Sequence, residues 1–160
     1  MTIWSDFIEG LRLVVTTIMD VVATPVLIYF LVINTALLML MGLAYQKYML
    51  ELEKQQEVLA AITDVVMDIF AMESALLRTQ KLAESGKGAN AADMTAVLVR
   101  DAMAHIDVTA RTVIGACSDG DTLRTNLVVL RRFSKYEPVD SIALRRQIAQ
   151  RLLAAERYTV

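Results

Sequence analysis

The side chain best suited to acid–base or metal chemistry is His105, the single histidine of this 160-residue chain. Asp101 lies four residues earlier, on the same face of a predicted helix, where its carboxylate could orient the imidazole ring. One histidine and one carboxylate are too few for a zinc site, which needs three or four protein ligands. We therefore interpret His105 as a structural residue.

Two other sets of residues could in principle do chemistry. Cys117 is the single cysteine, and no second cysteine or histidine lies near it in sequence to activate a thiolate. Glu57, Asp64 and Asp68 share one face of a predicted helix, but the Glu-x-x-His pairs of a di-iron bundle are absent. A buried thiol and a solvated acidic face explain these residues. We expect no catalytic, cofactor-binding or metal-binding residue.

The composition favours an all-helical protein. Two prolines and six glycines leave few residues that break helices, and hydrophobic residues make up 56% of the chain. The formal net charge of −2 and the lack of a basic stripe exclude nucleic acid as an expected partner. With one cysteine the chain cannot form an internal disulfide, which suits a reducing compartment.

A long apolar segment, residues 25–45, contains no charged side chain. A helix of about 20 residues is about 30 Å long, which is the thickness of the hydrocarbon core of a bilayer. The segment also lacks the polar stripe typical of a helix at the surface of a soluble domain. We therefore predict a transmembrane helix, with a helix buried in a soluble bundle as the alternative. The residues marking the predicted span are Val26, Phe30, Asn34, Leu38 and Gly42.

Residues 1–24 form a separate unit, an amphipathic helix that ends at a Thr-Pro pair. Trp4 lies on its apolar side, which suits a helix in the membrane interface; packing on partner spans is the alternative. Lys47 and Lys54 follow the span while Arg12 alone precedes it, so the C-terminal part is expected in the cytoplasm. The predicted location is the bacterial inner membrane, with the lipid bilayer as a partner.

The remaining residues, 46–160, have the periodicity of amphipathic helices. The segment SGKGAN, 85–90, separates the first two helices, and Asp140 or Ser141 is expected to cap the last one. Short connections between such helices give an up-down four-helix bundle. The predicted fold class is all-α: an amphipathic helix, one transmembrane helix and the bundle. The expected helices of the bundle are 45–84, 90–117, 122–134 and 141–156.

Cations are concentrated in the last two predicted helices. Facing a bilayer, such a cluster would bind anionic lipid headgroups; the alternative is an ordinary exterior paired with Glu137, Asp140 and Glu156. The cluster consists of Arg131, Arg132, Lys135, Arg145, Arg146 and Arg151.

Several segments in a fixed order carry a family resemblance. They are KQQEVLAAITDVVMDIFAMESALLRTQKL, the LRRFSKYEP turn at 130–138, and the terminal RYTV. Together they resemble the C-terminal helical extension of very-long-chain-type acyl-CoA dehydrogenases, bacterial members in particular, over residues 45–160. The resemblance implies a helical domain that packs on a catalytic core and helps to set the dimer. The flavin, the acyl-CoA and the catalytic glutamate of that family belong to the core, so no catalytic residue is carried over.

The apolar segment PVLIYFLVINTALLMLMGLA, 25–44, also looks like the first transmembrane span of some family 2 glycosyltransferases. With both resemblances the chain would join two unrelated proteins, as a natural rearrangement or a chimera. Three functions follow as hypotheses. The first is a non-catalytic, membrane-anchored protein for docking or homo-oligomerisation. The second is an accessory subunit that tethers a separately encoded acyl-CoA dehydrogenase core. The third is a soluble or artificial bundle without activity.

Overall fold

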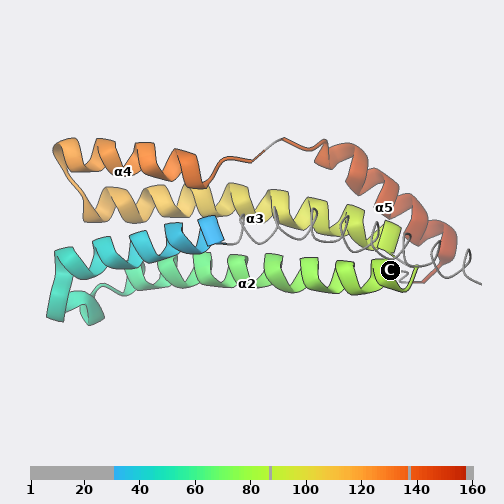
Figure 1. The fold of residues 1–160 in the computed structure, drawn as a ribbon, viewed down its shortest axis with the longest axis horizontal. Coiled ribbons are helices and arrows are strands. Elements are labelled where there is room, and N and C mark those ends of the chain that lie inside the picture. Colours follow the sequence, from blue (N-terminus) through green and yellow to red (C-terminus); the bar gives the residue numbers. More distant parts are fainter. Residues whose placement is uncertain (1–30, 87, 137, 158–160) are drawn as a thin grey trace, which may run out of the picture.

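The computed structural model describes residues 31–86, 88–136 and 138–157, and most of them are helical. The first described helix covers residues 31–48. The helices then alternate in direction as far as residue 133, and the last helix continues onward from the end of the one before it (Figure 1). No strand occurs among the described residues, so the predicted all-α class is confirmed. The elements that follow are η1 (Met49–Lys54), α2 (Gln56–Glu84), α3 (Gly88–Cys117), α4 (Gly120–Phe133) and α5 (Ser141–Ala155).

The chain reverses between residues 48 and 56, where the sequence predicts one continuous helix over 45–84. Met49 adopts a left-handed conformation, with φ of 45°, and the tight 3₁₀ turn of η1 follows it. No glycine or proline marks this reversal in the sequence, and Met49 adopts the strained conformation with a full side chain. The prediction of an unbroken helix is therefore wrong, and the 31–48 helix folds back along α2 (Figure 1).

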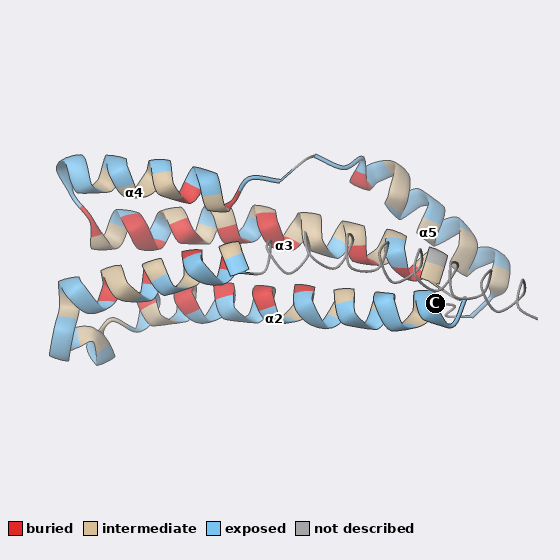
Figure 2. Ribbon diagram, viewed as in Figure 1, coloured by how far each residue is buried: buried red, intermediate tan, exposed pale blue. Residues whose placement is uncertain are grey.

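The apolar run is half-buried by the later helices of this same chain. Ile33, Ala36, Leu40 and Ala44 recur at spacings of three and four, and all four are buried (Figure 2). Leu40 is 0% exposed, whereas Leu38 on the opposite side is 66% exposed. The segment therefore forms the first helix of the bundle and buries one face against protein.

The predicted transmembrane span and the predicted location in the bacterial inner membrane, with the bundle on the cytoplasmic side, are wrong. No helix within residues 31–86, 88–136 and 138–157 is long and apolar enough to cross a bilayer. The burial of the inner face against α2 and α3 gives the physical reason, because these side chains already have protein around them. Val26, Phe30 and the amphipathic helix predicted over 1–24 lie outside the described residues.

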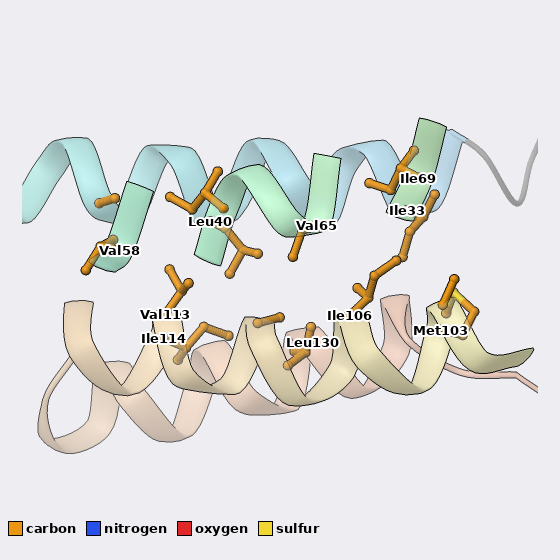
Figure 3. Close-up of a cluster of buried hydrophobic side chains, with 14 of the residues drawn as sticks. Ile33, Leu40, Val58, Val65, Ile69, Met103, Ile106, Val113, Ile114 and Leu130 are labelled. Carbon is orange, nitrogen blue, oxygen red and sulfur yellow. The ribbon is translucent and has the colours of Figure 1, made fainter. Parts of the chain in front are cut away.

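The core lies along the seam between α2 and α3, with the 31–48 helix laid against it. Figure 3 shows two layers of side chains that point toward each other, one from the 31–48 helix and α2, the other from α3 and α4. Burial of each such aliphatic side chain stabilises the fold by about 1.5–3 kcal/mol. The labelled side chains of this core are Ile33, Leu40, Val58, Val65, Ile69, Met103, Ile106, Val113, Ile114 and Leu130.

The connection between α2 and α3 requires two glycines. Gly86 has a φ of 75°, which a residue with a side chain adopts only with strain. Gly88 lies so close to Ala83 that a Cβ atom would come within 2.7 Å of the Ala83 Cβ. The helix end predicted at SGKGAN is confirmed, and its glycines keep α2 and α3 in close antiparallel contact.

The last two helices both pack on α3. Leu130 of α4 is fully buried, while Leu123 and Leu127 pack against the same core. The Asp140 side chain accepts hydrogen bonds from the backbone N–H groups of Ile142 and Ala143, at 3.2 and 3.0 Å. The predicted N-cap of α5 is therefore confirmed.

The two faces of the 31–48 helix should respond differently to truncation. We expect Leu40→Ala to lower the free energy of unfolding by about 2–5 kcal/mol, because it leaves a cavity in the core. Leu38→Ala removes an exposed side chain of the same type and should change stability by less than about 0.5 kcal/mol. Urea unfolding followed by circular dichroism measures both. Equal effects would contradict the packing of this helix on α2 and α3.

Candidate functional site

His105 pairs with a carboxylate on α2. Its Nδ1 atom lies 2.6 Å from Oδ2 of Asp68, so the contact joins α2 to α3. This contact and the nearby charge of Asp64 raise the pKa of His105 above its ordinary value. Asp101, the partner considered from the sequence, binds two arginines instead. The fold brings Asp68 to His105 as its partner, and the interpretation of His105 as a structural residue stays a prediction.

Asp101 and Asp107 act as anchors on the surface of α3. Asp101 accepts hydrogen bonds from Arg100, at 2.8 Å, and from Arg145 of α5. Asp107 accepts two from Arg111, at 2.8 and 3.0 Å, and a third from the Ser134 hydroxyl at the end of α4, at 2.7 Å. These hydrogen bonds to the ionised forms lower the pKa values of both carboxyl groups.

Two cations of the predicted basic cluster, Arg145 and Arg151, pair with residues of α3. Arg145 pairs with Asp101, and Arg151 pairs with Asp93 and also donates to Asn90 at 2.7 Å. Arg131, Arg132, Lys135 and Arg146 are exposed. The partners are thus carboxylates of α3 rather than the Glu137, Asp140 and Glu156 considered from the sequence. A contact of this cluster with lipid headgroups stays a prediction that no observation tests.

Cys117 is half-buried at the end of α3, and burial raises the pKa of its thiol. A raised pKa keeps the sulfur protonated near neutral pH, so it is a poor nucleophile. Within the described part of the chain, no three His, Cys, Asp or Glu side chains converge as metal ligands. The expectation that the chain has no catalytic or cofactor-binding residue of its own stays a prediction.

The feature left to carry a function is an exposed apolar surface. On the 31–48 helix, Leu31, Leu38 and Tyr45 recur every seven residues and so lie along one side. On α2, Met67, Phe70 and Leu77 are similarly exposed, Phe70 at 69%. We call these two sets the outer stripes. Further exposed apolar residues nearby in sequence are Met41, Met49, Leu50 and Val66.

The apolar residues of the outer stripes are visible in the sequence, but only the fold shows that they lie on an exposed face. Residues 31–48 are apolar on both sides of the helix. A helix in a bilayer and a helix packed against protein on two faces both have this pattern. Burial of one face against α2 and α3 leaves the other face exposed (Figure 2). A large exposed apolar surface in a folded domain marks an interaction site. The predicted span residues Asn34 and Leu38 lie on this outer side.

Stability contributed by the His105–Asp68 pair should fall as the pH rises. The pair needs a protonated imidazole, and its folded-state pKa is raised. The contribution is therefore complete below about pH 6.5 and is lost as the pH passes through the raised pKa. Because the pair is partly solvated, we expect a loss of less than about 1 kcal/mol between about pH 5.5 and pH 8.5. Urea midpoints at both pH values measure it.

His105→Gln and Asp68→Asn should each abolish this part of the pH dependence. Asp121→Asn is the matched control, because Asp121 pairs with Arg124 at a nearly fully exposed site, 3.4 Å apart. It should leave the pH dependence unchanged. A pH dependence that persists in both pair variants would contradict the assignment.

Comparison with known proteins identifies the domain. The family described as "Acyl-CoA dehydrogenase, C-terminal domain" matches residues 33–132. The "Probable acyl-CoA dehydrogenase" of Bacillus subtilis (strain 168) is 38% identical over 122 residues, covering 74% of this chain and 20% of that protein. The crystal structure of an acyl-CoA dehydrogenase complexed with FAD from Bacillus anthracis superposes with a TM-score of 0.79. It is 37% identical, and the match covers 82% of this chain and 24% of that one.

The family match begins ahead of the boundary at residue 45 that the sequence suggests. It starts at residue 33 and so includes most of the 31–48 helix. A junction of two unrelated proteins near residue 45 would fall inside the match, and the glycosyltransferase resemblance loses its basis over residues 33–44. The chain spans about a quarter or less of the length of these relatives. It belongs to the acyl-CoA dehydrogenase C-terminal domain family.

Proposed function

We propose that this chain is a non-catalytic helical domain that docks onto the FAD-containing catalytic core of an acyl-CoA dehydrogenase through its outer stripes. The core is supplied by the same or another polypeptide. The observation that carries the proposal is the exposed apolar side of the 31–48 helix within a domain of this family. The matched relatives are about four to five times longer than the match, so most of each relative lies outside the matched region.

The chemistry of the outer stripes supports a protein partner. Leu38, Tyr45 and Phe70 present aliphatic and aromatic groups at the surface. Aromatic and apolar side chains of this kind contribute most of the free energy at protein interfaces. A partner that covers these side chains would also protect the apolar surface from aggregation.

A groove between α2 and α3 is small for a flavin. Its volume is about 160 Å³, whereas cofactor sites are typically about 300–1,000 Å³. It is lined by α2 and α3 residues that are mostly apolar, and Arg78 is its single charged side chain. The flavin would therefore be held by the core, and the contribution of this domain would be structural.

Self-association is the second candidate function. The outer stripes would bury the same apolar groups against a second copy of the chain. A symmetric dimer formed in this way uses one surface twice. The two candidates differ in whether a flavoprotein is bound.

The proposal predicts a defined result for affinity purification of the tagged chain from its native cells. We expect it to recover a protein with a flavin absorption spectrum that mass spectrometry identifies as an acyl-CoA dehydrogenase. Leu38→Glu and Phe70→Glu should each reduce the recovered flavin at least about tenfold, because a buried charge without a partner is costly.

The matched control is Leu153→Glu on α5, which changes an equally apolar side chain that is 77% exposed and lies outside the outer stripes. It should leave the recovered flavin unchanged. Recovery of a colourless homo-oligomer that Leu38→Glu dissociates would instead support self-association. Flavin recovery insensitive to both stripe variants would contradict docking through the outer stripes.

A further inference from the structure

α5 has no residue in the apolar core that joins the other described helices. Of α2, α3 and α4, it packs only on α3. Ser141, at the first position of α5, is its one buried residue, and no α5 residue belongs to the core (Figure 2). α4 is a slightly shorter helix, yet its Leu130 is fully buried in that core. α5 therefore lacks the apolar anchor that holds α4.

The side of α5 that faces α3 is apolar but stays partly in water. Leu144, Ile148 and Leu152 recur every four residues on the same side as Arg151, and all three are half-buried. Ile142 and Leu153 lie elsewhere on the helix and are 63% and 77% exposed. Docking of α5 on α3 thus removes only part of its apolar surface from water, and the stabilisation is correspondingly smaller than for a core helix.

Two arginines supply the specific contacts between α5 and α3. Arg145 pairs with Asp101, while Arg151 pairs with Asp93 and also donates to the side-chain oxygen of Asn90 at 2.7 Å. The side chains of the two ion pairs are between 29% and 51% exposed. Dissolved salt screens charges that contact water, so both pairs weaken as the ionic strength rises.

The carboxylates on α3 keep alternative partners when α5 leaves. Asp101 also accepts a hydrogen bond from Arg100 of α3 itself, at 2.8 Å. Asp93 is 29% exposed, so water can take the place of Arg151. Breaking an ion pair is costly when it leaves a buried charge without a partner, and neither carboxylate is in that situation.

We propose that α5 detaches from α3 as a unit while the rest of the bundle stays folded, and that the Arg145–Asp101 and Arg151–Asp93 pairs set how often it does so. Elements with few buried apolar contacts open locally at a lower free energy than the core does. Salt acts as the switch, because screening of both pairs favours the open form. This device is separate from docking through the outer stripes, to which α5 does not belong.

Hydrogen exchange of the full chain, measured by mass spectrometry under native conditions, tests the proposal. After correction for intrinsic rates, we expect the backbone amides of α5 to exchange at least about tenfold faster than those of α4, with similar protection along the helix. Raising the NaCl concentration from about 0.05 M to about 1 M should speed α5 exchange about two- to fivefold and leave α4 unchanged.

Substitution of either arginine should reproduce the effect of salt. Arg145→Gln and Arg151→Gln should each speed α5 exchange about two- to fivefold at low salt and reduce its response to salt. Adding Asp93→Asn to Arg151→Gln should have little further effect, because the pair is already broken. Arg146→Gln is the matched control, since it removes the same charge from an exposed α5 residue that belongs to no ion pair among the described residues. It should leave α5 exchange unchanged.

Three results would overturn the proposal. Exchange of α5 and α4 at a common rate would mean that both helices open together with the core. Rates that rise only toward residue 155 would indicate fraying of the helix end instead of detachment as a unit. Equal effects of Arg146→Gln and Arg151→Gln, or α5 exchange that is insensitive to salt, would show that the two ion pairs do not control the opening.

Discussion

The structure depends on the burial of one side of the 31–48 helix against the α2–α3 seam. Ile33 and Leu40 fit between residues of α2 and α3, and both are almost completely removed from solvent. Without this contact, the largely apolar 31–48 helix would expose apolar groups on both of its sides. The chain reverses next to this helix at Met49, whose left-handed backbone has no glycine to favour it.

α3 is the element to which the other helices attach. Apolar contacts join it to α2 and to the 31–48 helix, and Leu130 joins α4 to the same core. Three carboxylates on its surface, Asp93, Asp101 and Asp107, then orient α5 and the end of α4. Such partly exposed ion pairs contribute little free energy each, so they set the position of a helix more than they stabilise it.

The division into an inner and an outer face connects the fold to the proposed function. A helix whose two sides are both apolar can serve a bundle on one side and a partner on the other. Binding through the outer stripes of this helix and of α2 would rely on apolar contact and would need no polar site. Among the described residues, no three His, Cys, Asp or Glu side chains are grouped as metal ligands. The proposed partner, a dehydrogenase core, is inferred from membership of this family.

Local sequence signals determined much of this protein. The helix class, the turn at Gly86, the cap at Asp140 and the family follow from residue types and spacings, because propensities and caps act over a few residues. The environment of the apolar run cannot be inferred from local sequence, because a lipid bilayer and a protein core both favour apolar side chains. The reversal at Met49, the pairing of His105 with Asp68 and the tying of Arg145 and Arg151 to α3 bring together residues distant in sequence. Only tertiary packing decides such contacts, because each depends on where an entire helix lies.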